Sequence, residues 1–550
     1  MKLYFDRLTR LVGADRKRVL ARLPYIGLDI ESRESDSVRV EYSPNRPDLA
    51  TDYGIAKALR GILGIQLGLP RYSTSSSGVQ VRVDRKLARV RPYVACAVAR
   101  GLKMDKEDVR QLISMQEDLH NGLGRKRRKV AIGLHNLDVI RPPISYESAA
   151  PTLKLTPLGG SQKIELAQIL AESQTGRTYG HILAGASGYP ILKDSKGLIF
   201  SFPPIINGNE TKVSVTTRNL FIDVTSTDEE AGEDTLAIVC TTLADMGARI
   251  GFVLVKYGDR RRVTPDLRPR KFSLDRDLVR KVTGLAINSS EIDVCLRRSR
   301  IEPLGRVSVL APRYRIDLLH PVDLAEEVAL GYGIDRIEPA YPPSPTPGSF
   351  NSVSQLIEKF VELMTSSGLT ESMGYELLDE LTLYQHFGRP SNGKIEVENP
   401  RSIEHAVLRD SVLPSLMGVL SRNVKEEYPQ RVFEVGRVYN REEEYVRESW
   451  HLGVLIAHAQ AGYSEAKSYL DAFFRTLYGK ELRTHGSSRW GFLEGRCASI
   501  EFSGGTLGHV GEITPGSIAA FGVNLPVVGF ELDLTSLLER ETRAEEGTTK

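Results

Sequence analysis

The sequence predicts a multidomain α+β protein, and three observations lead to that class. The chain has 550 residues, too many for one hydrophobic core, and about 150 residues per domain gives roughly three or four domains. Hydrophobic residues make up 41% and charged residues 26%, close to the globular average, which argues against a disordered or fibrous chain. Short alternating strand patterns and helical patterns are interspersed along the length, which is typical of mixed structure.

Residues 1–80 are expected to form a small domain that ends at a linker. The extended X-Pro stretch EYSPNRPDL is followed by a helix with Asp48 as its N-cap. One helical face carries four apolar residues at i, i+4, i+7 and i+8: Ile55, Leu59, Ile62 and Leu63. Residues 73–78 show neither periodicity nor apolar content, which predicts a linker there.

A second domain is expected over residues 84–262. Strand patterns occur at VRVDRK, VACAVAR, KVAIGLHNL and GFVLVKYG, and helices are predicted over EDVRQLISMQEDLH and DTLAIVCTTLADMGARI. This mixture predicts an α+β domain.

Two further domains are expected at residues 267–342 and 350–540. The former has two helical patterns and a short strand pair, and it ends at YPPSPTPG, whose prolines can continue neither a helix nor a central strand. The latter begins with the amphipathic helix SVSQLIEKFVELMTSSG and continues through the strands RVFEVGRVY, HLGVLIAHA, RCASIEF and VVGFELDL. That order is typical of helices packed on an antiparallel sheet. The final RETRAEEGTTK is expected to fray.

The chain shows no membrane or targeting signal. No stretch approaches the roughly 18 consecutive apolar residues that cross a bilayer, and MKLYFDRLTRLVG lacks the apolar core of a signal peptide. We therefore expect a soluble, cytoplasmic protein with no membrane partner. The four cysteines are too far apart for a CxxC metal site and are expected to be inert thiols: Cys96, Cys240, Cys295 and Cys497.

Positive charge is concentrated in one short run. A net charge of +3 excludes a uniformly basic nucleic-acid coat, so any contact with a polyanion must be local. GRKRRKV contains five consecutive cations, residues 125–129. Such a run is either a solvated surface or a segment that neutralises phosphates, and the pattern leaves both open.

The stretch RYRIDLLHPVDLAEEVALGYG, residues 313–333, carries four acids: Asp317, Asp323, Glu326 and Glu327. RYRIDLL alternates like a strand, and Pro321 suits the first turn of the helix that follows. The last three acids share one helical face near the N-terminus, where the helix dipole favours carboxylates without any ion. Like charges this close also repel one another unless a cation intervenes, and hard oxygen ligands select Mg²⁺. The pattern is compatible with both a solvated acidic face and a magnesium site.

Seven stretches resemble one family, the β subunit of phenylalanyl-tRNA synthetase in its archaeal and eukaryotic form. In chain order they are NRPDLATDYGIAKALRG, LGRKRRKVAIGLHNLD, YPILKDSKGLIFSFPPIINGNET, LFIDVTSTD, RYRIDLLHPVDLAEEVALGYGIDRI, ENPRSIEHAVLRDSVLPSLMGVLSRN and RVFEVGRVY. They follow the family's order over nearly the full length. The resemblance implies an N-terminal domain, a B3/B4-type editing domain, a winged-helix-like B5 domain and a class II synthetase-like antiparallel sheet domain without an active site.

The resemblance also implies partners and a reaction. In this family two α and two β subunits form a phenylalanine–tRNA ligase, in which the α subunit joins phenylalanine to tRNA(Phe) using ATP. A class II site needs arginines that grip phosphates. In RVFEVGRVY, Arg431 and Glu434 faintly resemble the strand that supplies one such arginine, but after Gly529 the first arginine is Arg540, so we expect a catalytically silent domain. The rival hypothesis is a free-standing tRNA-binding or trans-editing factor, which would not need this long domain.

Five residues resemble the family's editing region: Ser201, Asn207, Asp223, Thr225 and Thr227. Hydrolysis of Tyr-tRNA(Phe) needs a pocket that accepts an extra hydroxyl, because a pocket built for phenylalanine rejects tyrosine only weakly. Hydroxyl and carboxylate groups can bind the phenol, orient water or hold the terminal ribose. Without the resemblance, FIDVTSTD is an ordinary strand ending in a Ser/Thr turn. His135 is a second candidate for a base, although a lone histidine is more often structural.

The resemblance favours the metal interpretation of the acid cluster. In this family the acids at these spacings are magnesium ligands, so Mg²⁺ is expected at Asp317, Asp323, Glu326 and Glu327. Its expected role is in structure or subunit contact, not in the chemical step.

Overall fold

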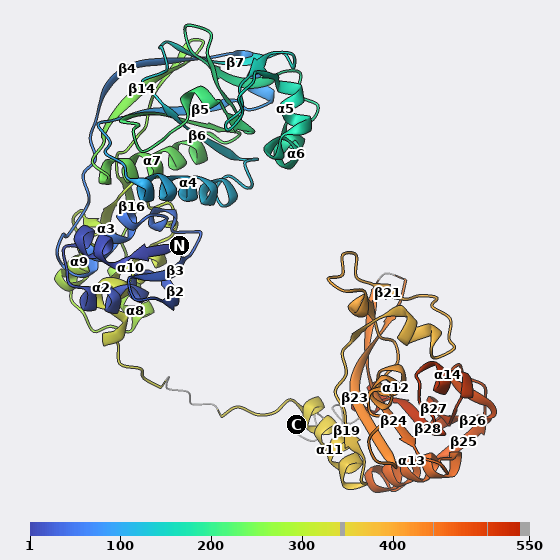
Figure 1. Cartoon of the computed structure of the whole chain (residues 1–550). Helices are drawn as coiled ribbons and strands as arrows, with labels where there is room; N and C mark the ends of the chain where they lie inside the picture. Colours follow the sequence, from blue (N-terminus) through green and yellow to red (C-terminus); the bar gives the residue numbers. More distant parts are fainter. Residues whose placement is uncertain (342–346, 444, 503, 540–550) are drawn as a thin grey trace. The chain divides into compact units, whose positions relative to one another are not determined.

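The computed structural model describes residues 1–341, 347–443, 445–502 and 504–539. The chain divides into two compact units, Met1–Tyr341 and Pro342–Lys550 (Figure 1). The division falls at the predicted proline-rich linker, of which residues 342–346 lie outside the described part. Within the described residues, no helix is long and apolar enough to cross a membrane.

The first unit begins with a small three-stranded sheet of order β1-β3-β2, formed by Lys2–Tyr4, Ser37–Tyr42 and Leu28–Arg33. Three helices pack with it, α1 (Phe5–Val12), α2 (Arg16–Arg22) and α3 (Asp52–Ile62). The apolar face predicted for α3 is confirmed, since Ile55 and Leu59 are fully buried. The predicted N-cap is wrong: Thr51 caps α3 by accepting the N–H of Gly54. Asp48 is engaged by both Nε and Nη2 of Arg46 instead.

A ten-stranded sheet dominates the first unit. Its strand order is β12-β11-β10-β7-β4-β14-β5-β13-β6, with β15 added at β14. The bounds are β4 Thr74–Val83, β5 Tyr93–Arg100, β6 Val130–Asn136, β7 Ile144–Ala149, β10 Tyr189–Lys193, β11 Ile199–Phe202, β12 Ile206–Asn207, β13 Asn219–Ser226, β14 Arg249–Tyr257 and β15 Arg260–Thr264.

The linker predicted at residues 73–78 is wrong, because this segment begins β4. Thr74, Ser75 and Ser76 pair in parallel with Ile250, Gly251 and Phe252 of β14. The hydroxyl of Ser77 donates to the carbonyl of Phe252 at 2.5 Å. Pairing with a buried neighbour therefore outweighs the weak intrinsic strand preference of serine, as β-propensity depends strongly on context.

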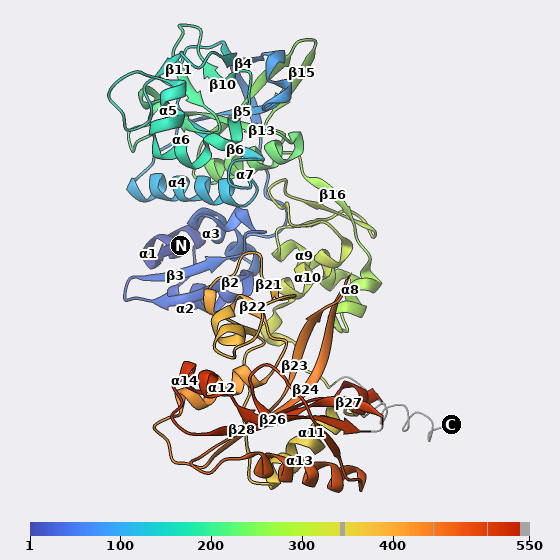
Figure 2. The same ribbon diagram turned by 90° about the vertical axis from the view of Figure 1, so that its right-hand side faces the viewer.

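Two helices cover one face of this sheet, α4 (Lys106–Asn121) and α7 (Glu229–Asp245), which lie side by side in Figures 1 and 2. Leu112, Met115 and Leu119 of α4 pack with Ile132 and Leu134 of β6 in the main core. The helix predicted from DTLAIVCTTLADMGARI ends earlier than expected, since β14 begins at Arg249. Two short helices, α5 (Leu166–Glu172) and α6 (Gln174–Tyr179), lie between β7 and β10 in the chain.

The last part of the first unit is a three-helix, three-strand segment. Its sheet has the order β16-β18-β17, formed by Arg270–Ser273, Ser308–Ala311 and Glu302–Pro303. α10 (Pro321–Tyr332) packs against α8 (Arg276–Thr283) and α9 (Ser289–Arg298), as Figure 2 shows. Gly331 permits the close approach, because a Cβ there would lie 2.1 Å from the carbonyl oxygen of Cys295. The sequence predicted two of these helices and one strand pair.

The second unit is built on a seven-stranded sheet of order β19-β23-β24-β28-β27-β26-β25. The bounds are β19 Thr370–Glu371, β23 Gln430–Arg441, β24 Val446–Ala457, β25 Arg483–Gly486, β26 Phe492–Phe502, β27 Gly505–Ile513 and β28 Val527–Asp533. α11 (Ser352–Ser366) and α13 (Tyr463–Tyr478) pack in one apolar core of this sheet. α12 (Leu413–Arg422) and α14 (Pro515–Ala520) contribute to a second. The predicted frayed tail, residues 540–550, lies outside the described residues.

Candidate functional site

A cavity of about 380 Å³ lies in the first unit, beside the edge strand β6. Its lining comes mainly from α4, β6, β13 and the segment 201–213, which includes the end of β11 and all of β12. β12 and β6 are opposite ends of the strand order, so the sheet must curl to bring both to one cavity. Most of the lining is apolar, including Leu112, Leu134 and Ile205, and the volume is in the range of small-molecule sites.

Three of the five predicted editing residues line this cavity. Ser201 and Asn207 lie directly opposite each other in the β11–β12 pairing, and Asp223 comes from β13. Residues from both ends of a ten-stranded sheet are therefore collected around one space. A buried carboxylate, a hydroxyl and an amide within apolar walls can fix the orientation of a small polar ligand.

Thr225 and Thr227 are not part of the lining. The hydroxyl of Thr225 accepts the Nε–H of the buried Arg91 at 2.8 Å, and its carbonyl accepts from Nη2 at 2.7 Å. Burial lowers the pKa of Arg91 to about 10. Thr227 is exposed, and its N–H donates to the carbonyl of Lys129 at 3.0 Å. In this structure both residues make hydrogen bonds to neighbouring segments of the same chain and do not line the cavity.

The predicted basic run forms a left-handed turn between α4 and β6. Arg125, Lys126 and Arg127 have φ values of 48°, 54° and 65°, a conformation that costs free energy for residues other than glycine. Arg91 holds the turn by donating to the carbonyls of Arg127 and Arg128, each at 3.2 Å. Persistent strain of this kind is found where the surroundings impose it, often at functional sites.

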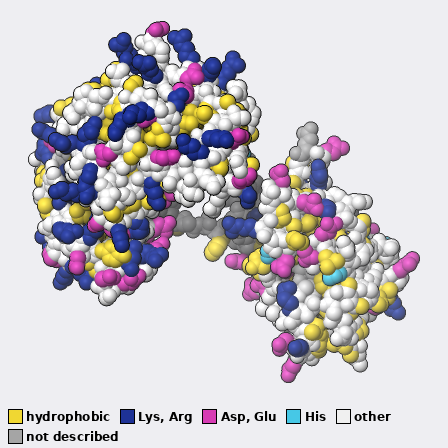
Figure 3. Space-filling model, turned by 45° about the horizontal axis from the view of Figure 1, so that its top comes forward, with side chains coloured by type: hydrophobic (Ala, Val, Ile, Leu, Met, Phe, Trp, Pro, Cys, Tyr) yellow, Lys and Arg dark blue, Asp and Glu magenta, His cyan; other side chains and the backbone are white. Residues whose placement is uncertain are grey.

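The five cations of the turn have different environments. The Arg127 guanidinium donates to the carbonyl of Ile205 at 3.0 Å and to Glu117 at 2.9 Å, so it closes one side of the cavity. Lys129 pairs with Asp228 at 3.0 Å. Arg125, Lys126 and Arg128 are exposed. Lys and Arg side chains also occur across much of the face of the first unit visible in Figure 3.

Asp223 is joined to two residues that the sequence analysis did not group with it. Its Oδ1 lies 2.8 Å from Nε2 of His135, and Nδ1 of His135 lies 2.9 Å from the hydroxyl of Thr211. His135 is fully buried, whereas Thr211 and Asp223 line the cavity. The second candidate base therefore lies behind the cavity wall and does not face the ligand space.

Several lining residues were missed by the sequence reasoning, above all Gln116, Glu117 and His120 on α4. A signal was present, because Leu112, Gln116 and His120 recur at helical spacing and the stripe becomes polar toward its end. His120 is structural: its Nε2 accepts the N–H of Ile132 at 2.8 Å, and burial lowers its pKa, which favours the neutral ring.

The acid cluster is organised around Arg315. Its guanidinium donates to Oδ1 and Oδ2 of Asp317 at 2.9 and 2.6 Å and also bonds Glu327, and all three groups are largely or fully buried. Burial alone would raise the pKa of Glu327, but Arg315 and Arg46 outweigh it and hold that pKa below its usual range. Arg315 thus supplies the positive charge that the sequence argument assigned to a metal ion.

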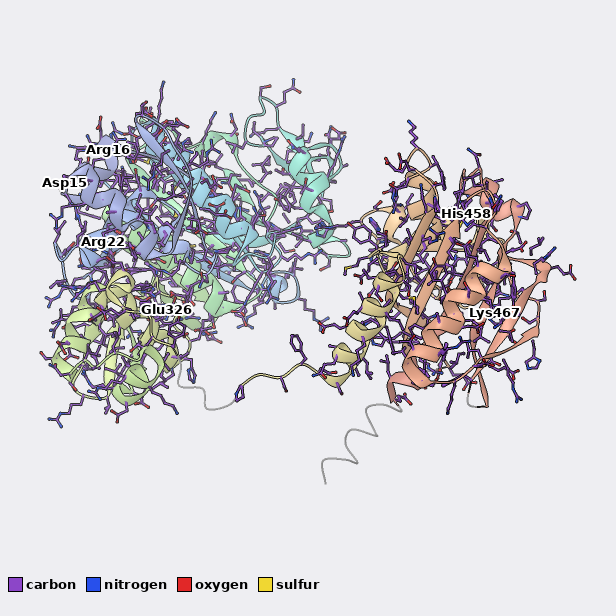
Figure 4. The ribbon with its side chains drawn as sticks, turned by 90° about the horizontal axis from the view of Figure 1, so that it is seen from below. Asp15, Arg16, Arg22, Glu326, His458 and Lys467 are labelled. Atoms are coloured by element: carbon purple, nitrogen blue, oxygen red, sulfur yellow. The ribbon has the colours of Figure 1, made fainter. Side chains whose placement is uncertain are left out.

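The other two acids are nearer the surface. One oxygen of Asp323 accepts the N–H groups of Leu319 and His320, each at 2.7 Å, as a capping group of α10. Glu326, labelled in Figure 4, is exposed, and its pKa is raised by partial burial and by the neighbouring carboxylates. Among the described residues no three His, Cys, Asp or Glu side chains are arranged to hold a metal ion. The four acids therefore do not form a complete magnesium site as arranged.

In the second unit, the charged groups that resembled a class II site form ion pairs with other side chains. Arg431 pairs with Glu465 at 3.0 Å, and Glu434 is buried against Arg409 at 2.7 Å. Gly529 lies between β24 and β27, where a Cβ would be 2.0 Å from the carbonyl oxygen of Val454, so the sheet itself requires that glycine. Arg540 lies outside the described residues.

Three family models match the chain, and with the fold they define its class. The Phenylalanyl tRNA synthetase beta chain CLM domain matches residues 337–534, the tRNA synthetase B5 domain residues 272–334, and the B3/4 domain residues 104–236. The chain is therefore a multidomain protein of the aminoacyl-tRNA synthetase class. It combines a curled sheet that lines a cavity, a segment that matches the B5 domain, and an antiparallel sheet covered by helices.

Relatives extend this match over nearly the whole chain. The phenylalanine–tRNA ligase beta subunit of Archaeoglobus fulgidus is 39% identical over 544 residues, 98% of each chain. That of Thermococcus gammatolerans is 38% identical, over 90% of this chain and 89% of the relative. A crystallised N-terminal fragment of the phenylalanyl-tRNA synthetase beta subunit from Pyrococcus horikoshii is 36% identical, with a TM-score of 0.58, over 60% of this chain and 99% of the fragment. The chain belongs to the phenylalanine–tRNA ligase beta subunit family and is a ligase subunit.

Proposed function

We propose that this chain assembles with an α subunit, two copies of each, into a cytoplasmic phenylalanine–tRNA ligase, and that its cavity hydrolyses Tyr-tRNA(Phe). In the assembled enzyme the α subunit uses ATP to attach phenylalanine. The observation that supports the editing role is the placement of Ser201, Asn207 and Asp223 around one largely apolar cavity. The apolar walls suit an aromatic ring, and the polar groups suit the additional phenolic hydroxyl or the ester end.

The hydrolytic step needs a group that activates water. Asp223 is the carboxylate of the predicted set that lines the cavity, so it is our candidate general base. The water oxygen bonds to the ester carbonyl carbon while its proton passes to Asp223. The bond from that carbon to the ribose oxygen then breaks, and the proton returns to the ribose oxygen. Free tyrosine and intact tRNA(Phe) are the products.

The left-handed turn is the proposed contact for the tRNA backbone. Arg125, Lys126 and Arg128 are exposed next to Arg127, which lines the cavity. Exposed cations at this position can neutralise phosphates of the strand whose end enters the cavity.

The proposal is tested by mixing the chain with its α subunit and measuring loss of tyrosine from Tyr-tRNA(Phe) and of phenylalanine from Phe-tRNA(Phe). Selective loss of tyrosine supports the editing role, and equal stability of both esters overturns it. Co-elution of the two chains in size exclusion separates a synthetase subunit from a free-standing editing factor.

The chain alone is expected not to catalyse phenylalanine-dependent exchange of pyrophosphate into ATP. Arg431 and Arg409 are committed to Glu465 and Glu434, so neither is available to bind the α-phosphate of ATP. The measurement is incorporation of labelled pyrophosphate into ATP, with the assembled enzyme as the positive control. Exchange by the isolated chain at a rate comparable to the assembled enzyme would show that this domain is catalytic.

Magnesium is proposed at the start of α10 only as a contact shared with another chain. Of the four predicted ligands, Glu326 makes no ion pair among the described residues, while Arg315 already pairs with Asp317 and Glu327. Mg²⁺ usually keeps several waters and takes few protein carboxylates, so donors from a partner would have to complete the shell. A bound ion would offset the repulsion among these carboxylates.

Glu326→Gln is therefore expected to remove any Mg²⁺ dependence of α-subunit binding without unfolding the chain, because Glu326 is exposed. The measurement is the affinity for the α subunit with and without Mg²⁺. Glu338→Gln, which changes another exposed acid, is the control and should keep the parental dependence. Equal Mg²⁺ dependence in both variants and the parent would mean that the cluster is only a charged helix end.

A further inference from the structure

We propose that His135 and Thr211 are positioning residues of the cavity: they hold one oxygen of Asp223 so that its other oxygen is presented to the attacking water. The inference rests on the proposed editing function and concerns how that site is built. It arises from a hydrogen-bonded chain of three side chains, contributed by β6, β13 and the turn Asn209–Thr211, in which the buried His135 links two residues of the cavity lining.

Strand pairing places this chain. In the β6–β13 register, Gly133 lies opposite Asp223 and His135 lies opposite Phe221. A Cβ on Gly133 would stand 2.3 Å from Oδ1 of Asp223 and 2.5 Å from Nε2 of His135. The absence of a side chain at position 133 therefore makes room for the hydrogen bond between the imidazole and the carboxylate.

The partners of the imidazole define its proton arrangement. A carboxylate oxygen can only accept, so Nε2 of His135 carries the proton that is donated to Asp223. In the neutral ring Nδ1 then accepts from the Thr211 hydroxyl, which lies 2.9 Å away. Asp223 thus fixes the tautomer, and the Thr211 hydroxyl, which can donate or accept and also lies 3.3 Å from the carbonyl of Gly208, holds the other side of the ring.

The carboxylate is asymmetric as a result. Oδ1 is bonded to His135, whereas Oδ2 has no hydrogen-bond partner among the described residues, and Asp223 lines the cavity. A base must lie within hydrogen-bond reach of the proton that it removes. Fixing Oδ1 keeps Oδ2 turned toward the ligand space, which is the contribution that we assign to His135.

The surroundings allow this role to be separated from packing. The His135 ring lies edge-on to Phe200, with ring centroids 4.9 Å apart, and Phe200 in turn contacts Phe221. An aromatic ring without nitrogen would fill the same volume but could not donate to Asp223. A glutamine could donate through its amide and accept from Thr211 through its carbonyl. His135→Phe and His135→Gln therefore test shape and hydrogen bonding independently.

The experiment measures kcat and KM for hydrolysis of Tyr-tRNA(Phe) by the ligase assembled with the parental chain, His135→Phe, His135→Gln or Thr211→Val. We expect His135→Phe to lower kcat about 10- to 100-fold, the scale of removing a hydrogen bond to a charged group. KM should stay within about twofold, because the lost interaction is not made to the substrate. His135→Gln should recover most of the rate, and Thr211→Val should lower kcat by less than His135→Phe.

The possible results are distinguishable. Phenylalanine attachment serves as the measure of intact assembly, and thermal unfolding reports on folding of each variant. A parental rate in His135→Phe, a change in KM with unchanged kcat, or failure of His135→Gln to recover the rate would each overturn the inference while leaving the editing proposal in place. If His135→Phe does not fold, the inference is still tested by His135→Gln and Thr211→Val. An equal loss of kcat in these two variants would mean that His135 has only a structural role. An inactive parental ligase would overturn the editing proposal and this inference with it.

Discussion

Replacing Asp223 with asparagine is expected to lower hydrolysis of Tyr-tRNA(Phe) by the assembled ligase about 100- to 10,000-fold, the range that a general base contributes. Asparagine has the same shape, and its carbonyl oxygen can still accept from Nε2 of His135, the contact that Asp223 makes at 2.8 Å. The cavity then receives an amide group, which cannot take a proton from water. Attachment of phenylalanine should be unchanged, because the proposed synthetic site belongs to the α subunit.

The measurement is single-turnover deacylation of Tyr-tRNA(Phe), with accumulation of that ester during synthesis as a second readout. Asp259→Asn is the control, since Asp259 is a fully exposed acid of the same domain that lies 3.7 Å from Arg85. It should edit at the parental rate. Parental hydrolysis by Asp223→Asn would show that Asp223 is not the base and that the site has been placed on the wrong residues.

Replacing Arg315 with methionine is expected to destabilise the region around α10 by about 3–5 kcal/mol, the scale of breaking a buried ion pair from one side. Methionine preserves most of the apolar volume, but Asp317 and Glu327 would keep buried carboxylates without their main counter-charge. Amide hydrogen exchange in Pro321–Tyr332 measures the free energy of local opening. Arg268→Met is the control, because Arg268 is exposed and solvent screens its ion pair with Asp266, so this change should leave the local opening of α10 as in the parent.

The pH dependence has a definite sign. In the parent, the pKa of folded Glu327 is held below its usual range, so this group stabilises the fold at neutral pH, and that contribution is lost as pH falls through the lowered pKa. Without Arg315, the influence of burial is opposed mainly by Arg46, so the pKa of Glu327 should rise. The difference in opening free energy between parent and variant should therefore shrink as the pH falls from the raised pKa of Glu327 in the variant to its lowered pKa in the parent. A constant difference would mean that Arg315 acts through packing alone.

Local pattern determined the elements whose side chains alternate or recur regularly. EDVRQLISMQEDLH became α4, RVFEVGRVY became β23, and SVSQLIEKFVELMTSSG became α11, because burial of one face imposes a period of 3.6 or 2 residues. The class of protein was also set by sequence, through seven ordered stretches and not through any single residue. The same reasoning placed Ser201, Asn207 and Asp223 together by resemblance, before any distance was known.

Tertiary contacts decided the rest. The composition of residues 73–78 predicted a linker, yet this segment begins a strand because its backbone pairs with the buried strand β14. Thr225 belongs to the same short motif as Asp223, but its hydroxyl accepts a hydrogen bond from Arg91, which lies 134 positions earlier in the chain. The sequence predicted a magnesium site at the acid cluster, but it could not show that Arg315 pairs with Asp317 and Glu327. A periodic pattern reports which face of an element is buried, whereas the partner of a polar side chain depends on which distant segment the fold brings to it.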